Sequence, residues 1–124
     1  MYRVAKEIVF RAGHTLRFGQ DRREEPHEHD WRIRAVVESA ELHADELVMD
    51  FEELGQLLHQ VVKPLTQVEM LNELGAFTNH NPSTECIARY VYEKLKLLVP
   101  DTVHLREVVV WEREDCRVSY RPVE

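Results

Sequence analysis

Apolar and polar residues alternate along two long segments of the chain, residues 3–15 and residues 30–42. Alternation with a period of two is typical of a strand with one buried face. The two segments are therefore predicted to form a long antiparallel hairpin, joined by a polar loop over residues 17–26. Two shorter strands are predicted near the end of the chain, at residues 105–112 and, after a charged turn, at residues 117–121.

In the middle of the chain, apolar residues recur with the spacing of a helix. Asp50 can cap a first helix, which is predicted to end at Pro64. A second helix is predicted to start near Pro82 and Ser83 and to stop at Pro100. The apolar faces of the two helices consist of Phe51, Leu54, Leu57, Leu58, Val61 and Val62, and of Ile87, Ala88, Val91, Leu95 and Leu98.

The connection between the two helices, residues 65–80, shows neither the apolar period of a strand nor that of a helix and is predicted to be irregular. Long irregular connections in compact domains often carry function. The whole chain then has the order ββααββ and no internal repeat. This order predicts one α+β domain over residues 1–124, an antiparallel sheet with both helices on one face.

Three histidines fall on matching faces of the predicted hairpin. His27 and His29 are two residues apart, so on an extended strand both point to the same face, about 6–7 Å apart. His14 belongs to the neighbouring strand, where it falls on the apolar face. Three imidazoles leave the fourth position of a tetrahedral zinc ion open, which is the catalytic pattern. The alternative is three unrelated surface histidines in a chain that has seven, but the matched parity favours a zinc site.

Composition narrows the classes of function. The chain has 44% hydrophobic and 31% charged residues, as soluble globular domains do, and a net charge of −7. Its lysines and arginines are scattered, which disfavours nucleic-acid binding. No apolar run is long enough to cross a membrane and no signal-peptide core is present, so a cytoplasmic protein is expected. Cys86, expected to be buried in the second helix, and Cys116 are expected to be free thiols.

Several short motifs follow one another along the chain. They are Phe-x-x-x-His at residues 10–14, His-Glu-His at residues 27–29, Val-Met-Asp-Phe at residues 48–51, a segment from Leu65 to Asn72, Asn-Pro-Ser-Thr-Glu at residues 81–85, and Glu112 at a strand end. Together they resemble the motifs of the 6-pyruvoyl-tetrahydropterin synthase and 6-carboxy-tetrahydropterin synthase family. The resemblance implies a T-fold, a zinc ion held by His14, His27 and His29, and an oligomeric barrel, a hexamer with pterin pockets between subunits.

The resemblance also implies how a pterin is bound. A carboxylate at Glu112 can accept two parallel hydrogen bonds from the amino-pyrimidinone edge of the ring. Thr84 and Glu85 are placed at the rim of the pocket. From the residues alone, Glu112 could instead be a solvated charge, Thr84 a helix cap and Glu85 a partner of the helix dipole.

The chain departs from the family at its proton shuttle. The cysteine expected four residues before the His-x-His motif is Arg23, and the aspartate and histidine of the later loop are Thr66 and Gln67. A subgroup of the family carries a glutamate three residues before the motif, and Glu24 has that spacing. A partly desolvated carboxylate beside zinc could act as general base; the alternative is a solvated charge in a polar loop. His80, in the irregular segment, could replace the lost histidine in space.

The preferred hypothesis is a zinc-dependent lyase that acts on 7,8-dihydroneopterin triphosphate or a close relative. The resemblance implies either the 6-carboxy product, on the branch that leads to deazapurines such as queuosine, or the 6-pyruvoyl product. A competing hypothesis is a T-fold protein that binds zinc and a pterin- or purine-like ring without the usual turnover. A third is an interaction domain whose histidines bind no metal.

Overall fold

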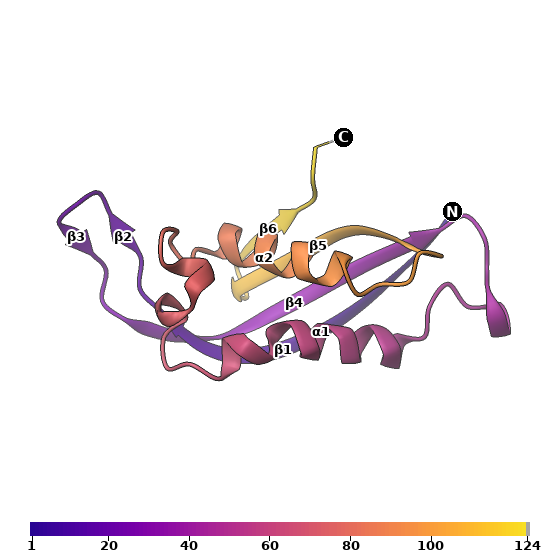
Figure 1. The fold of residues 1–124 in the computed structure, drawn as a ribbon, viewed down its shortest axis with the longest axis horizontal. Helices are drawn as coiled ribbons and strands as arrows, with labels where there is room; N and C mark the ends of the chain where they lie inside the picture. Colours follow the sequence, from indigo (N-terminus) through magenta and orange to yellow (C-terminus); the bar gives the residue numbers. More distant parts are fainter. Residues whose placement is uncertain (124) are drawn as a thin grey trace.

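The computed structural model describes residues 1–123, and its main feature is a four-stranded antiparallel sheet (Figure 1). The strands occur in the order β1-β4-β5-β6 and span Tyr2–His14, His27–Ser39, His104–Arg113 and Cys116–Tyr120. Helices α1 (Phe51–Thr66) and α2 (Thr84–Lys96) pack on one face, α1 against β1 and α2 against β5 and β6. The core lies between the helices and this face. The predicted α+β class and the arrangement of sheet and helices are confirmed.

The predicted hairpin of β1 and β4 is confirmed and extends further toward its connection. Its register runs without interruption from Tyr2↔Ser39 to His14↔His27. β4 therefore begins at His27 rather than at residue 30 and ends at Ser39 rather than at residue 42. On the face without helices, the Arg11 guanidinium donates hydrogen bonds to carboxylates at positions 28 and 30, which supports pairing as far as the histidines.

The connection between β1 and β4 was expected to be a loop and instead contains a small ribbon. β2 (Arg17–Phe18) pairs with β3 (Arg22–Arg23). Gly19 adopts a φ of 68°, a left-handed conformation that glycine adopts without strain. Two-residue strands are too short to show alternation, so the sequence pattern could not reveal them. The ribbon projects at one end of the molecule, beside the segment that joins the helices (Figure 1).

Helix α1 begins as predicted but does not end at Pro64. The Asp50 carboxylate accepts a hydrogen bond from the Glu52 amide at 2.8 Å and caps the helix. The helix continues to Thr66 because Pro64 lies in the last turn, where a missing N–H removes only one helical hydrogen bond. The fully buried Leu65 then holds that turn against the core.

Helix α2 begins after Ser83, whose hydroxyl accepts a hydrogen bond from the Cys86 amide at 3.1 Å. The helix ends at Lys96, so Leu98 lies outside it and is exposed, contrary to the prediction. The amides of Leu98 and Val99 both donate to the Leu95 carbonyl, and the final turn that they close leaves the Leu98 side chain exposed. Cys86 is half-buried rather than buried, since its side chain lies at the edge of the packed face.

The segment between the helices is irregular, as predicted, apart from two single 3-10 turns, η2 (Leu71–Glu73) and η3 (Gly75–Phe77). Each turn buries one apolar side chain in the core. At Gly13 and Met70 the segment forms a parallel bridge with β1, and a Cβ on Gly13 would lie only 3.0 Å from the Met70 sulfur. The segment is thus fixed beside the end of β1, where His14 lies.

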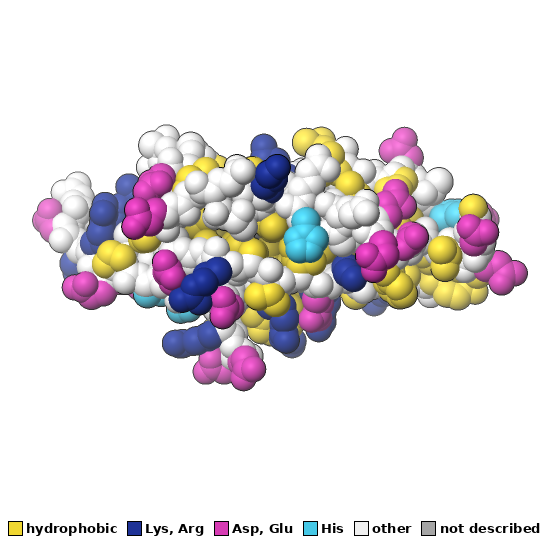
Figure 2. All heavy atoms as spheres, turned by 90° about the horizontal axis from the view of Figure 1, so that it is seen from below, with side chains coloured by type: hydrophobic (Ala, Val, Ile, Leu, Met, Phe, Trp, Pro, Cys, Tyr) yellow, Lys and Arg dark blue, Asp and Glu magenta, His cyan; other side chains and the backbone are white. Residues whose placement is uncertain are grey.

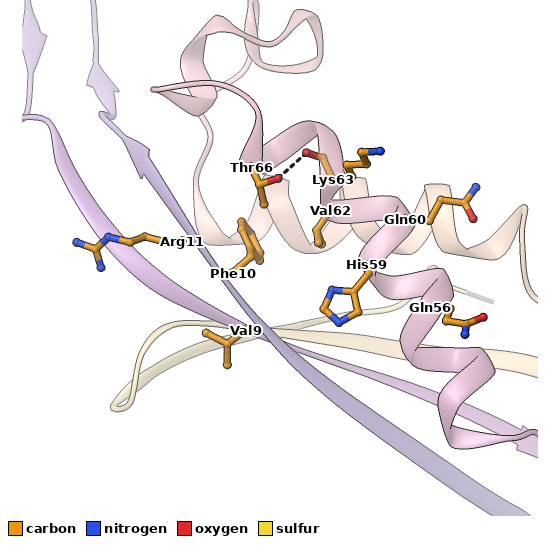
Figure 3. A pocket seen from close by; sticks show the side chains of 9 residues that line it. All are labelled: Val9, Phe10, Arg11, Gln56, His59, Gln60, Val62, Lys63 and Thr66. Carbon is orange, nitrogen blue, oxygen red and sulfur yellow. Dashed lines mark hydrogen bonds between the residues drawn. The ribbon is translucent and has the colours of Figure 1, made fainter.

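A groove of about 750 Å³ lies between β1 and α1 (Figure 3). Val9 and Phe10 line it from the strand, and His59 and Thr66 line it from the helix. Figure 2 shows hydrophobic side chains exposed between charged groups of both signs on one side of the molecule.

The Thr66 hydroxyl donates to the Lys63 carbonyl at 2.8 Å, so the residue at the family's aspartate position is engaged within its own helix.

Candidate metal centre

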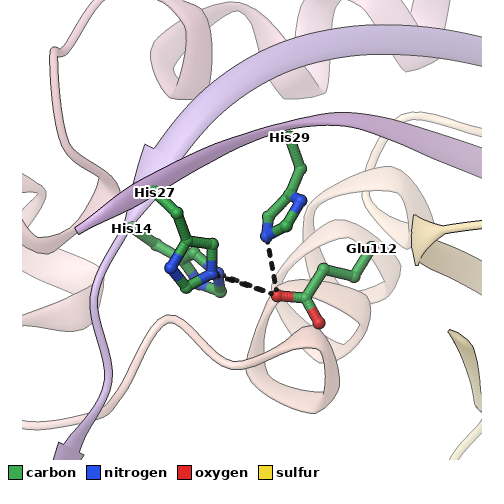
Figure 4. A group of neighbouring side chains, drawn as sticks. All are labelled: His14, His27, His29 and Glu112. Carbon is green, nitrogen blue, oxygen red and sulfur yellow. Dashed lines mark hydrogen bonds and ion pairs between the residues drawn. The ribbon is translucent and has the colours of Figure 1, made fainter. Parts of the chain in front are cut away.

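Three histidines meet at the end of the β1–β4 hairpin (Figure 4). His14 and His27 are partners in the strand register, and His29 follows two residues later on β4. The Nε2 atoms of His14 and His27 are 2.7 Å apart, and the ring centroids of His27 and His29 are 4.5 Å apart. His14 is buried, whereas His27 and His29 are half-buried. The three histidines therefore converge, as their strand parity predicted.

Backbone carbonyls orient two of the three imidazoles. Nδ1 of His14 lies 2.8 Å from the Pro82 carbonyl oxygen, and Nδ1 of His27 lies 2.9 Å from the Glu25 carbonyl oxygen. A carbonyl only accepts hydrogen bonds, so each Nδ1 carries a proton, and the Nε2 atom of each ring is the one turned to the centre. Metal-binding histidines are held in this way by their surroundings. Pro82 directly precedes the cap of α2, so the start of this helix is tied to the centre.

The third imidazole has a buried nitrogen without a partner. Nε2 of His29 makes no hydrogen bond within residues 1–123, although the Glu112 carboxylate lies 3.1 Å away. Burial lowers the pKa of His29, which favours the neutral ring with a free lone pair. Buried polar atoms are rarely left unpaired, and three converging lone pairs fit a zinc ion well. The geometry fits the metal, and metal binding itself stays a prediction.

Glu112 lies closer to the histidines than sequence reasoning foresaw. Its Oε1 atom is 2.9 Å from Nε2 of His14, 3.1 Å from that of His29 and 3.5 Å from that of His27 (Figure 4). The ligand atoms of all four residues lie within 4.8 Å of one another. The available signal was parity, because Glu112 follows Val108 and Val110 on the helix-facing side of β5. Its predicted role in ring binding stays a prediction.

Glu24 lies beside the same centre. One carboxylate oxygen, Oε1, accepts a hydrogen bond from the Leu16 amide at 3.0 Å and lies 3.8 Å from Nε2 of His27. The Glu24 backbone is also fixed, because its amide donates to the Leu16 carbonyl and its carbonyl accepts from the Thr15 hydroxyl. The side chain is 30% exposed, so it is partly desolvated and still open to a ligand. This position fits the general base that the sequence suggested.

Two asparagines hold the chain between His14 and Glu24. The side-chain amide of Asn72 pairs with both the amide and the carbonyl of Thr15, at 3.1 and 2.8 Å. Asn81 pairs in the same way with Arg17, at 2.8 Å in both directions. Each asparagine therefore replaces a neighbouring strand at a place where β1 has left the sheet. Sequence reasoning used both residues only as family matches and did not foresee this role.

Removal of the Asn72 amide should destabilise this end of the molecule. Asn72→Ala leaves two backbone groups of the buried Thr15 unpaired, and we expect a loss of about 1–3 kcal/mol in the free energy of unfolding. Urea unfolding measures the change. The matched control is Asn79→Ala on the exposed Asn79, which should change the free energy by less than about 0.5 kcal/mol. Equal stability of the two variants would contradict the bracing role.

Trp31 forms the floor of the centre. The ring is fully buried, with its centroid 5.0 Å from that of His14 and 5.6 Å from that of His29, both edge-on. Its indole N–H donates to the Ala12 carbonyl at 3.1 Å. The side chain thereby joins β4 to β1 and restricts the rings of two candidate ligands.

Trp31→Phe should therefore destabilise the protein strongly for so conservative a substitution. We expect a loss of about 2–4 kcal/mol, because the substitution leaves a cavity and removes the hydrogen bond that the indole donates to the Ala12 carbonyl. Thermal or urea unfolding reports the change. Ile33→Val, at a fully buried position two residues further along β4, is the control and should cost about 0.5–1.5 kcal/mol. A smaller effect at Trp31 than at Ile33 would count against this account of the packing.

Among residues 1–123, the other predicted site residues make no hydrogen bond or ion pair with the three histidines or Glu112. Thr84 is half-buried at the first position of α2, and Glu85 is exposed on its first turn. Arg23 lies exposed in the ribbon. His80 is exposed and lines a hollow of about 420 Å³ with Cys86, and it is not one of the converging ligands. The pocket-rim roles of Thr84 and Glu85 stay predictions.

The fold and the histidine centre define an α+β domain with a candidate metal site at one end of its sheet. Residues 3–123 match the model of the 6-pyruvoyl tetrahydropterin synthase family. The chain is 32% identical over 117 residues to a dihydroneopterin monophosphate aldolase of Pyrococcus furiosus, with 94% of this chain and 95% of the relative covered. The chain therefore belongs to the 6-pyruvoyl tetrahydropterin synthase family, a family of pterin-processing enzymes.

Solved structures confirm the T-fold. The 6-pyruvoyl tetrahydropterin synthase of Plasmodium falciparum has a TM-score of 0.77 at 17% identity, over 96% of both chains. A catalytic-residue mutant of the Plasmodium vivax enzyme has a TM-score of 0.73 at 18% identity, over 98% of both chains. Among residues 1–123, no helix is both long and apolar enough to cross a membrane.

Proposed function

We propose that this protein is a zinc-dependent lyase that shortens the side chain of a phosphorylated 7,8-dihydroneopterin by retro-aldol cleavage. The observation that carries the proposal is the position of Glu24. Its carboxylate lies beside the three-histidine centre, held by the Leu16 amide, in a chain with arginine at the usual cysteine position. The 32% identical relative from Pyrococcus furiosus, an aldolase for dihydroneopterin monophosphate, supports this reaction and this substrate.

His14, His27 and His29 would hold the zinc ion through their Nε2 atoms. When bound, the ion supplies a Lewis acid that polarises side-chain oxygens of the substrate and lowers the pKa of a hydroxyl group. Trp31 and the carbonyls of Pro82 and Glu25 keep the three rings in place. These contacts preorganise the ligands before a substrate arrives.

Glu24 would perform the proton transfer. Its carboxylate accepts the proton of the C2′ hydroxyl while the C1′–C2′ bond breaks. The C2′ carbon becomes the aldehyde of glycolaldehyde phosphate, and the electron pair of the broken bond passes from C1′ into the conjugated C6=N5 bond of the ring. A proton returned to C1′ completes 6-hydroxymethyl-7,8-dihydropterin. Atoms and electrons balance without a further reactant, which suits a site with one base.

Glu112 would recognise the ring. A carboxylate can accept two parallel hydrogen bonds from the amino-pyrimidinone edge of the pterin, as the resemblance implies. Thr84 and Glu85 would line the rim of the pocket. A hollow of about 500 Å³, lined by His29, Trp111 and Glu112 together with charged side chains of both signs, would admit a ring to this carboxylate. Assembly into a hexamer, with pockets between subunits, is carried over from the resemblance.

The use of a glutamate in catalysis has support from a solved relative. In the Plasmodium vivax 6-pyruvoyltetrahydropterin synthase, the catalytic residue that was replaced by alanine and by cysteine is a glutamate. A carboxylate can therefore serve in catalysis on this fold. That likeness supports Glu24 as the base and does not fix the product of this chain.

A second candidate is a protein that binds zinc and a pterin without turnover. The chain lacks the family's Asp-His pair, because its positions hold Thr66 and Gln67, and the Thr66 hydroxyl is bonded to its own helix. Cleavage of a phosphate-free or triphosphorylated dihydroneopterin is open to the same site. Product analysis separates these cases.

The test is incubation of zinc-loaded protein with 7,8-dihydroneopterin carrying no phosphate, one phosphate or three. We expect mass spectrometry to find 6-hydroxymethyl-7,8-dihydropterin, formed fastest from the monophosphate. A 6-pyruvoyl or 6-carboxy product would contradict the proposed reaction. Binding of the pterin with no product from any of the three would favour the second candidate.

A further inference from the structure

The small ribbon formed by β2 and β3 carries positive charge that no carboxylate balances. Its residues 17–23 contain three arginines, Arg17, Arg22 and Arg23, and one aspartate, so the ribbon has a net charge of +2 in a chain whose net charge is −7. Among residues 1–123, none of these three arginines makes an ion pair. Carboxylates do contact the arginines at positions 3, 11, 32, 34, 106 and 113. The ribbon is therefore suited to bind an anion.

Two of these arginines lie directly opposite each other. Arg17 and Arg23 are partners in the register of β2 and β3. The Asn81 side chain binds both backbone groups of Arg17, which therefore point away from β3. The two arginines thus form the narrow kind of antiparallel pair, in which facing side chains come closest. Like charges in such a pair destabilise the ladder, and an anion held between the two guanidinium groups would remove the repulsion.

The third arginine lies on the other face of the ribbon. Arg22 is the register partner of Phe18, and its guanidinium carbon lies 5.8 Å from the centroid of the Phe18 ring. Successive side chains of a strand point to opposite faces. Arg22 therefore has the same charge and the same strand as Arg23 but does not belong to the Arg17–Arg23 pair.

The arginine pair directly follows the proposed base along the ribbon. The Glu24 amide donates to the Leu16 carbonyl, and the Leu16 amide donates to the Glu24 carboxylate, both at 3.0 Å. Arg17 follows Leu16, and Arg23 precedes Glu24. The arginine pair is therefore one residue, about 3.3 Å, further from the histidines than the pair of Leu16 and Glu24.

The proposed substrate has its groups in the same order. Glu24 would take the proton of the C2′ hydroxyl, and the phosphate of 7,8-dihydroneopterin monophosphate is carried on C3′, the next carbon. A phosphate dianion matches the ribbon's net charge of +2. Each guanidinium group can give a phosphate two parallel hydrogen bonds. Arg17 keeps donors for this role, because its one recorded side-chain bond, to the Thr78 carbonyl, uses only Nη2.

We infer that Arg17 and Arg23 bind the phosphate group of the substrate and so select a phosphorylated dihydroneopterin. The pair binds and orients the side chain of the substrate and takes no part in the proton transfer. Arg23, at the position where the family has its cysteine, thereby has a role in specificity in place of catalysis. This inference rests on the proposed function, which supplies the substrate.

The experiment measures binding of two probes to the zinc-loaded protein by isothermal titration calorimetry. The probes are neopterin and neopterin 3′-monophosphate, which differ only by the phosphate group. Binding is measured without any turnover. The wild type is compared with Arg17→Gln, with Arg23→Gln and with the control Arg22→Gln, and each variant removes one positive charge from the ribbon.

We expect the wild type to bind the monophosphate at least about tenfold more tightly than neopterin, because hydrogen bonds between charged groups are strong. Arg17→Gln and Arg23→Gln should lose most of this preference and keep their affinity for neopterin. Arg22→Gln should bind both probes as the wild type does. Arg23→Lys should restore only part of the preference, because an ammonium group lacks the planar pair of donors.

Two results would overturn the inference. The first is equal affinity of the wild type for the two probes, or binding of neither. The second is an equal loss of preference in Arg22→Gln and Arg23→Gln, which would show a general attraction to the ribbon's charge. Arg23 is exposed, so its variants should fold, and a urea unfolding curve checks that they do.

The binding experiment and the cleavage assay can fail separately. If the arginine pair accounts for tight binding of the monophosphate and no pterin product forms, the proposed lyase fails and the phosphate site stands. If product forms with the same KM for 7,8-dihydroneopterin and its monophosphate, the lyase stands and the phosphate site fails.

Discussion

Glu24→Gln should lower turnover of 7,8-dihydroneopterin monophosphate by about 10²–10⁴-fold, the usual contribution of a general base. Glutamine keeps the size of the side chain and can still accept from the Leu16 amide, but it cannot take a proton at neutral pH. Because Glu24 lies outside the group of converging ligands, zinc content and KM should change little. Steady-state kinetics and metal analysis of the same samples measure all three quantities.

The control for this variant is Glu25→Gln. Glu25 is exposed, and only its backbone carbonyl contacts His27, so its turnover should be that of the wild type. A fall in turnover of similar size in both variants would point to the charge of the loop rather than to a base at Glu24. Full activity of Glu24→Gln would remove Glu24 from the chemistry.

His27→Ala should weaken zinc binding by more than about 100-fold, because it removes a ligand and not merely one of its supports. Turnover should fall with the zinc content. Folding should persist, since His27 is half-buried at the last pair of a hairpin whose register extends back to Tyr2. Metal analysis, activity and a urea unfolding curve on one preparation separate these effects.

His59→Ala is the matched control, because His59 is an exposed histidine in the groove between β1 and α1. This variant should have the zinc content, the turnover rate and the stability of the wild type. If His27→Ala retained zinc and activity, the three-histidine centre would be wrong. If it unfolded the protein without changing the activity per folded molecule, zinc would be only a structural support.

The parts of this site that the sequence reveals are those fixed by a period of two. His14, His27 and His29 could be placed on one face because strand parity is independent of the rest of the fold. The histidine inference needs only local rules and one strand pair. The choice of Glu24 came instead from the resemblance, because a subgroup of the family has a glutamate at that spacing before the His-x-His motif.

Contacts made by loops could not be derived in this way. The Asn72 and Asn81 side chains reach backbone groups at positions 15 and 17, more than fifty residues away in sequence. The Pro82 carbonyl reaches His14 across a similar separation. No pattern along the chain indicates which backbone group an asparagine will meet. Such contacts follow from the packing of the segment between the helices.

The ends of both helices were predicted wrongly for the same physical reason. Pro64 is a strong stop signal, yet the burial of Leu65 carries α1 beyond it. Leu98 fits the apolar period of α2, yet the helix ends at Lys96, two residues earlier. Alternation places Glu112 on the helix-facing side of β5, but its distance from the histidines depends on how β5 packs beside β4. Tertiary packing decided each of these cases.

The measurement that tests the central claim most directly is cleavage of 7,8-dihydroneopterin monophosphate by the zinc-loaded protein in D₂O. Retro-aldol cleavage requires that C1′ gain a proton, so the product should be 6-hydroxymethyl-7,8-dihydropterin with one deuterium on the hydroxymethyl carbon, together with glycolaldehyde phosphate. Mass spectrometry and NMR identify both. Release of inorganic phosphate with a three-carbon side chain still attached to the ring would contradict the account.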